Sequence, residues 1–136
     1  MSTSSPDAEP RPKPGGLKRF FRSFGFAASG IVLLVRSEWN ARFHLVATIA
    51  AIAAGFYFDI THLEWISIFL AMGMVWAAEA LNTAIEWLCD RVESGCDERI
   101  RKAKDVAAGG VLCAAMAAAA VGLMIFAPRV LHWLAL

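Results

Sequence analysis

The sequence has little charge and few residues that interrupt regular structure. Asp, Glu, Lys and Arg make up only 18% of the 136 residues, and there are 5 prolines and 10 glycines. These low numbers exclude collagen-like and disordered classes, which need far more proline, glycine or charge. In contrast, 58% of the residues are hydrophobic and the mean hydropathy is +0.54. A single small domain in water could not bury so much apolar surface, so we expect an integral membrane protein.

Cysteine and net charge exclude two further classes. The 3 cysteines are odd in number and form no Cys-x-x-Cys pair, so a disulfide scaffold is not expected. The net charge is only +1, because 13 Lys and Arg residues face 12 Asp and Glu residues. A nucleic-acid-binding protein would carry a basic excess, so we expect no nucleic acid partner.

Three apolar segments are candidates for membrane spans. A bilayer core requires about 20 residues of helix, and we place the spans at about residues 43–60, 63–89 and 106–127. The first span is long enough only with its flanks, and the third is expected to break near Pro128. A cleavable signal peptide is not expected, because a long polar and basic stretch precedes the first apolar run.

The positions of the basic residues predict the orientation of the chain. Of the 13 Lys and Arg residues, 12 precede the first span or lie between the second and third spans. The connection between the first two spans contains none. By the positive-inside rule, the N-terminus and the second loop are cytoplasmic and the C-terminus faces outward.

The segment before the spans has two parts. Residues 1–16 are rich in Ser, Pro and Gly and are expected to form a disordered tail ahead of a single domain at 17–136. Over residues 17–37, apolar residues recur at steps of three and four, which predicts an amphipathic helix on the membrane surface. This helix is either an N-terminal anchor or a lid over a site on the cytoplasmic side.

The second span carries a stripe of polar residues. Glu79, Asn82, Glu86 and Asp90 project within an arc of about 80° at the helical angle of about 100° per residue. A charged side chain at the bilayer centre costs about 2.5–3.5 kcal/mol, so such residues are functional by default. If Trp65 marks the outer interface, Glu79 lies about 21 Å and Glu86 about 32 Å deeper. These depths correspond to the cytoplasmic third and the inner boundary of the bilayer.

The polar stripe on the second span has two interpretations, helix packing and metal binding. Polar groups can stabilise helix packing in membranes, and Asn82 alone would fit that role. The carboxylates fit it poorly, because like charges repel unless a cation lies between them or one of them is protonated. Oxygen ligands favour Mg²⁺, whereas the scattered residues His44, His62 and His132 are assigned no metal role.

Other charged residues are expected on the same side of the membrane. Glu38 precedes the first span, and a cluster of basic residues with an adjacent acid precedes the third, namely Arg99, Arg101, Lys102, Lys104 and Asp105. Positive charge and Mg²⁺ ligands around a boundary carboxylate are what phosphoryl transfer requires.

Two motifs resemble the signature of a known family. They are Glu79-Ala-Leu-Asn82-Thr-Ala-Ile-Glu86-Trp-Leu-Cys-Asp90 and Ala103-Lys104-Asp105-Val-Ala-Ala-Gly109. This combination resembles the small prokaryotic diacylglycerol kinases, integral membrane lipid kinases that also include undecaprenol kinases, over about residues 16–128. The resemblance implies an all-α homotrimer in the bacterial cytoplasmic (inner) membrane, with a surface helix and three spans per chain. It also implies MgATP as phosphoryl donor, although the chain has neither a GxxxxGK[ST] phosphate loop nor a protein-kinase catalytic loop.

The same resemblance implies roles for individual residues. Glu79 would be the catalytic base at the lipid hydroxyl, Glu38 and Glu86 would hold the metal, and Asn82 and Asp90 would support them. Contacts to ATP are implied for Arg19, Phe26, Glu38, Glu86, Gly95, Cys96, Asp97, Lys104 and Asp105.

The lipid substrate is not determined by these motifs. The stretch from Glu38 through Asn40 and Arg42 to His44 is more similar to undecaprenol-type members, and Arg42 is expected to contact the lipid. Undecaprenol and diacylglycerol both stay open as substrates. The alternative to a lipid kinase, from a different class of protein, is a non-catalytic oligomeric membrane scaffold.

Overall fold

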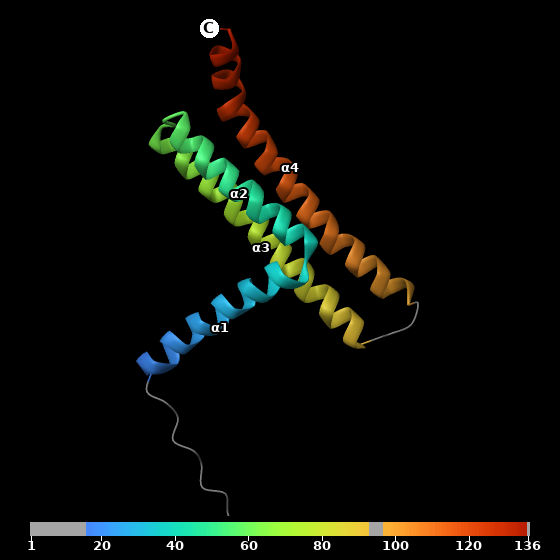
Figure 1. Ribbon diagram of the computed structural model, residues 1–136. Coiled ribbons are helices and arrows are strands. Elements are labelled where there is room, and N and C mark those ends of the chain that lie inside the picture. Colours follow the sequence, from blue (N-terminus) through green and yellow to red (C-terminus); the bar gives the residue numbers. More distant parts are fainter. Residues whose placement is uncertain (1–15, 93–96, 136) are drawn as a thin grey trace, which may run out of the picture. The chain divides into compact units, whose positions relative to one another are not determined.

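The computed structural model describes residues 16–92 and 97–135, and this part of the chain is all-α (Figure 1). The described helices are α1 (Gly16–Ser37), α2 (Trp39–Tyr57), α3 (His62–Val92) and α4 (Glu98–Leu134). This confirms the predicted fold class. Residues 1–15 of the expected tail lie outside the described residues, as do Gly95 and Cys96, two of the expected ATP contacts.

By length and composition, three of the described helices can cross a membrane: α3, α4 and the Arg19–Ser37 part of α1. Helix α2 is not among them, and Asn40, Arg42 and His44 make its first two turns polar. The surface position of α1 and the spanning position of α2 therefore remain predictions. They are supported by the pattern of side chains, because α1 is the most amphipathic of the described helices.

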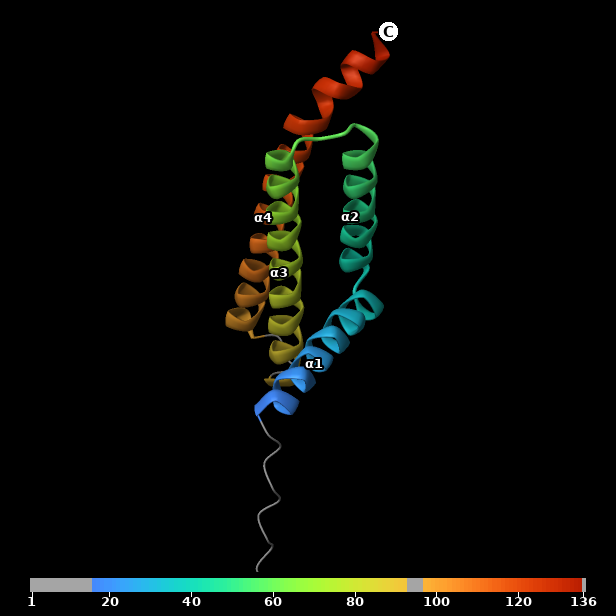
Figure 2. The same ribbon diagram turned by 90° about the vertical axis from the view of Figure 1, so that its left-hand side faces the viewer.

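Helices α3 and α4 lie side by side in opposite directions (Figures 1 and 2) and are joined near both ends. Asp90 of α3 bonds Lys104 of α4 at 2.8 Å, and Glu64 of α3 bonds Arg129 of α4 at 2.9 Å. The two acids are 26 residues apart and the two bases 25, so both ion pairs fit one antiparallel register. Between them, α3 and α4 contribute to a buried apolar cluster that includes Ile68 and Ile125.

The expected break near Pro128 is wrong, because α4 continues through Pro128 to Leu134. Pro128 lacks the N–H that would bond the carbonyl four residues earlier, so it weakens the helix at this turn. The Arg129 guanidinium lies across the same turn and donates to the Ile125 carbonyl at 2.6 Å as well as to Glu64. Figure 2 shows the direction of α4 changing toward its C-terminal end, as is typical of a proline kink.

A close approach at Gly55 joins α2 to the start of α3. A Cβ atom at position 55 would lie 2.7 Å from Cη2 and 2.9 Å from Cζ2 of Trp65. Real Cβ contacts are essentially never that short, so only glycine lets the indole pack onto α2. The chain between the helices turns sharply at Asp59, whose φ of 47° is left-handed, and buries Ile60 beneath the turn.

We expect Gly55→Ala to lower the free energy of unfolding by about 1–3 kcal/mol, the usual cost of overpacking. Trp65→Phe removes the two ring atoms that an added Cβ would meet, so the same change should cost much less in that background. Thermal unfolding of the wild type, Gly55→Ala, Trp65→Phe and the double variant in one detergent measures the cost of Gly55→Ala in both backgrounds. Equal costs in both backgrounds would show that Trp65 does not restrict position 55.

Candidate functional site

The buried face of α3 changes from apolar to polar along the helix. Ile68 and Val75 are buried toward its N-terminal end, and Glu79, Asn82 and Thr83 are buried further along the same face. Their exposed fractions are 1% for Glu79, 7% for Asn82 and 4% for Thr83. Glu79 is the largest fully buried side chain among the described residues. Burying a carboxylate this deeply is expensive, so this segment is not built for stability alone.

Two oxygens on this face have no hydrogen-bond partner in the described chain. They are Oε2 of Glu79 and Oδ1 of Asn82. Asn82 does use its amide group, because its Nδ2 donates to Oε1 of Glu86 at 2.9 Å. Asn82 thus orients Glu86 and leaves its own oxygen free. Buried oxygens that lack a donor leave acceptor sites for a hydroxyl group or a cation from outside the chain.

Three titratable side chains lie within electrostatic range of Glu79, namely His44, Glu38 and Glu86. The expected base is therefore close enough to both expected metal ligands for their charges to interact. Glu38 is the N-cap of α2 and is half-buried like Glu86. No role in the site was predicted for His44, although its spacing along α2 could have indicated one. Ala41, His44 and Thr48 are spaced by three and four residues and so share one face of α2.

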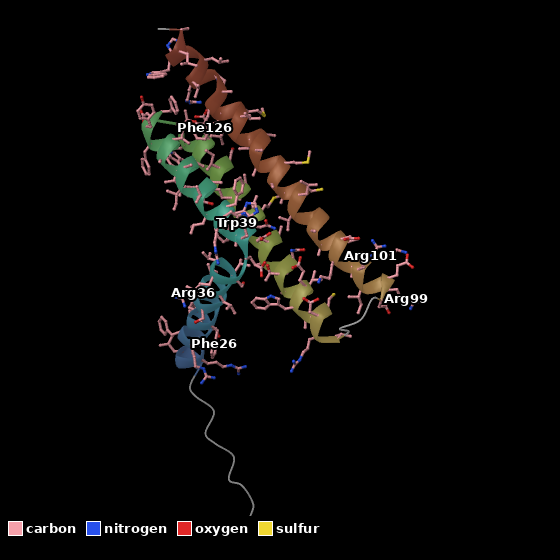
Figure 3. The ribbon with its side chains drawn as sticks, turned by 45° about the vertical axis from the view of Figure 1, so that its right-hand side comes forward. Phe26, Arg36, Trp39, Arg99, Arg101 and Phe126 are labelled. Carbon is pink, nitrogen blue, oxygen red and sulfur yellow. The ribbon has the colours of Figure 1, made fainter. Side chains whose placement is uncertain are left out.

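The expected nucleotide contacts at the start of α4 already have partners within the chain. Lys104 bonds Asp90, while the carboxylate of Asp105 lies 3.9 Å from Arg101. Asp97 is the N-cap of α4 and accepts from the Arg99 backbone N–H at 2.6 Å. Figure 3 shows Arg99 and Arg101 at this end of α4, and Lys104 lies within electrostatic range of Glu86. The first turns of α4 therefore bring positive charge toward the carboxylates of α3.

Arg42 makes structural contacts that the sequence pattern did not predict. Its guanidinium donates to the Val35 carbonyl at 3.0 Å and the Arg36 carbonyl at 2.5 Å, at the end of α1. Carbonyls at a helix C-terminus lack intrahelical partners, and a cation satisfies them well. Arg42 thus stabilises the corner that holds Glu38. Its expected contact with the lipid stays a prediction.

Arg19 and Phe26 lie in a separate compact unit that ends at Gly30. Both side chains are exposed, and the Arg22 guanidinium stacks over the Phe26 ring at 5.8 Å. Their expected contacts with ATP stay predictions.

The donor set can be compared with the needs of Mg²⁺. Within residues 16–92 and 97–135 no three His, Cys, Asp or Glu side chains form a group that could hold a metal. Magnesium on a nucleotide needs fewer protein ligands, because one or two carboxylates suffice when phosphates and waters complete the octahedron. Glu38 and Glu86 each lie within electrostatic range of the buried Glu79, and their oxygens are the donor type that such an ion prefers, so the residues present fit it.

In the described residues, helices that are able to cross a membrane carry a buried carboxylate on α3 and basic residues on α4, which is typical of a membrane protein with a polar functional site. The family model described as "Prokaryotic diacylglycerol kinase" matches residues 25–126. The chain belongs to the prokaryotic diacylglycerol kinase family and is a lipid kinase.

The relatives of this chain carry the names of two lipid kinases. The chain is 40% identical over 113 residues to a protein of Bacillus subtilis (strain 168) named "Undecaprenol kinase", covering 83% of this chain and 92% of the relative. A "Diacylglycerol kinase" of Synechocystis is 36% identical over 113 residues, covering 80% and 63%. Another "Diacylglycerol kinase", from Sinorhizobium, is 30% identical over 104 residues, covering 76% and 75%.

We expect Glu79→Met to raise the free energy of unfolding by about 1–3 kcal/mol, because it replaces a buried, incompletely partnered carboxylate by an apolar side chain of similar volume. Glu64→Met is the matched control on the same helix. The Glu64 carboxylate accepts from Thr61 and Arg129, so its replacement should be destabilising. Thermal unfolding in detergent measures both, and a loss of stability in Glu79→Met would show that its carboxylate is satisfied in the folded protein.

Proposed function

We propose that the protein transfers the γ-phosphoryl group of ATP to the hydroxyl of a membrane lipid alcohol, giving the lipid phosphate and ADP. The reaction takes place at the cytoplasmic face of a bacterial inner membrane, with the N-terminus of this multi-pass protein in the cytoplasm. The observation that carries the proposal is the buried Glu79 carboxylate with an unpartnered Oε2, placed beside Glu38 and Glu86. No observation favours the alternative of a non-catalytic scaffold.

Glu79 acts as the general base in this proposal. Its unpartnered Oε2 accepts the hydroxyl proton of the lipid as the hydroxyl oxygen attacks the γ-phosphorus. A base in hydrogen-bond reach of the attacking hydroxyl contributes about 10²–10⁴-fold to the rate. The lipid tail stays in the hydrocarbon while its head group reaches the polar end of the α3 face, which excludes water from the reacting atoms.

Glu38 and Glu86 would hold Mg²⁺ on the phosphates of ATP, and Asn82 orients Glu86 for that purpose. The ion would supply positive charge that offsets the charge on the phosphates. Lys104 adds positive charge from α4, and Asp90 orients it through their ion pair. Further nucleotide contacts come from Arg19, Phe26, Asp105 and the loop of Gly95, Cys96 and Asp97. The working assembly is a homotrimer.

Undecaprenol is the first candidate for the lipid. Similarity to the protein named "Undecaprenol kinase" is the strongest of the three relatives above and extends over nearly all of that relative. Diacylglycerol is the second candidate, because two other relatives carry that name. An apolar difference between acceptors typically gives about 10–200-fold discrimination, so we expect activity on both.

Phosphorylation of both lipids by ATP in the same detergent micelles tests the function. We expect kcat/KM for undecaprenol to exceed that for diacylglycerol. Glu79→Gln should lower kcat by about 10²–10⁴-fold with little change in the affinity for MgATP, because a base acts only in the transition state. Wild-type turnover by a folded Glu79→Gln protein would exclude Glu79 as the base, and transfer to neither lipid would refute the proposed function.

Glu38→Gln and Glu86→Gln should each raise the Mg²⁺ concentration needed for half-maximal activity, because both carboxylates contribute to one ion site. Their combined effect should be far from additive, as expected for residues that share one ligand. Titration of activity with Mg²⁺ at saturating ATP measures this. Asp59→Asn, at the α2–α3 turn, is the control that removes a carboxylate elsewhere. Unchanged Mg²⁺ dependence in both variants would place the metal on other residues.

A further inference from the structure

One hydrogen bond joins the middle of α2 to the middle of α3. The indole Nε1 of Trp76 donates to Oγ1 of Thr48 at 3.0 Å, and both side chains are half-buried. Among the described residues, no other side-chain hydrogen bond or ion pair connects these two helices. Helices α3 and α4, in contrast, are joined by an ion pair near each end. Besides the packing of Trp65 on Gly55 at the turn, this hydrogen bond is therefore the polar contact that aligns α2 with α3.

The Thr48 hydroxyl is used differently from other hydroxyls on the described helices. Ser23, Ser29 and Ser67 each donate to the carbonyl four residues earlier in their own helix. Such bonds are local and fix no neighbouring helix. Thr48 instead accepts from Trp76, which lies 28 residues away in the sequence. This hydroxyl is thus an interhelical contact rather than a local one.

The position of this bond matches the position of the carboxylates. Thr48 lies 10 residues after Glu38, and Trp76 lies 10 residues before Glu86. In antiparallel helices with a rise of about 1.5 Å per residue, both carboxylates fall about 15 Å from the bond in the same direction. They therefore lie at the same level of the bundle.

Two more pairs agree with this register. His44 is 4 residues before Thr48 and Glu79 is 3 residues after Trp76, which places them within about 1.5 Å of one level. Ala41 and Thr83 are each 7 residues from the bond, and both are buried. A slip of one helical turn, about 5.4 Å, would separate all these pairs. An ion that binds oxygens at about 2.0–2.1 Å would tolerate no such offset between Glu38 and Glu86.

We propose that Thr48 and Trp76 are positioning residues for phosphoryl transfer, because their hydrogen bond sets the register in which α2 presents Glu38 and His44 to Glu86 and Glu79. The inference rests on the proposed function. Interhelical hydrogen bonds of this kind contribute little to the stability of membrane bundles. A misplacement of about 1 Å in an active site, however, can cost about 10²-fold in rate. Loss of the bond should therefore affect the reaction much more than the fold.

The test uses the full-length protein with three substitutions at the bond. Thr48→Val keeps the shape of the side chain but removes the acceptor, Trp76→Phe removes the donor, and Thr48→Ser keeps the acceptor. We expect the first two to lower kcat at least about tenfold and to raise the half-maximal Mg²⁺ concentration several-fold, while thermal unfolding changes little. Thr48→Ser should retain activity within about twofold of wild type. The double variant Thr48→Val/Trp76→Phe should lose no more than either single variant.

Ser67→Ala is the matched control, because it removes a hydroxyl that bonds only within α3. Wild-type kinetics in Thr48→Val, or a loss in Thr48→Ser equal to that in Thr48→Val, would overturn the positioning role. Failure of the proposed function would give a different result from failure of the positioning role. If Glu38→Gln leaves the Mg²⁺ dependence unchanged, the metal assignment is wrong. If Glu38→Gln changes that dependence while Thr48→Val and Trp76→Phe do not, only the positioning role is wrong.

Discussion

Burial of the Glu79 carboxylate on a membrane helix is the constraint on which the arrangement around α3 depends. An uncompensated charge in hydrocarbon is costly, so neighbouring helices must cover it and leave room for a partner. Ala114 of α4 is 10 residues after Lys104 and Glu79 is 11 before Asp90, so the α3–α4 ion pair places a small residue at nearly the same level as the carboxylate. Ala114 is itself buried.

The polar groups are bonded more completely at one end of the bundle than at the other. At one end, the packing of Trp65 on Gly55 joins α2 to α3, and the contact of Arg129 with Glu64 joins α4 to α3. These groups are satisfied within the chain. At the other end, Glu79 and Asn82 keep unpartnered oxygens, which is unfavourable for stability and useful for binding. Along α3, fully bonded polar groups near its start are thus separated from incompletely bonded ones near Glu79.

Attachment of α2 is weaker than attachment of α4, and this affects the site directly. Glu38 lies at the start of α2, held by the contacts of Arg42 with the end of α1 and by the Glu38 N–H bond to the Leu34 carbonyl at 3.0 Å. Glu86 belongs to α3, which α4 holds in register through two ion pairs. The expected metal ligands thus come from one firmly held and one lightly held helix. Small displacements of α2 translate into changes of the distance between the two carboxylates.

Much of this protein could be deduced from the sequence, because composition and periodicity act within single helices. The apolar runs predicted an all-α membrane protein, and the spacing of Glu79, Asn82 and Glu86 predicted one polar face. Periodicity does not tell which helix covers that face. The proximity of His44 to Glu79 and the use of Arg42 on carbonyls of α1 depend on interhelical register, which the sequence pattern does not encode. The contact of Arg129 with Glu64 beside Pro128 was likewise beyond the sequence pattern, because side chains 65 residues apart meet only in the folded bundle.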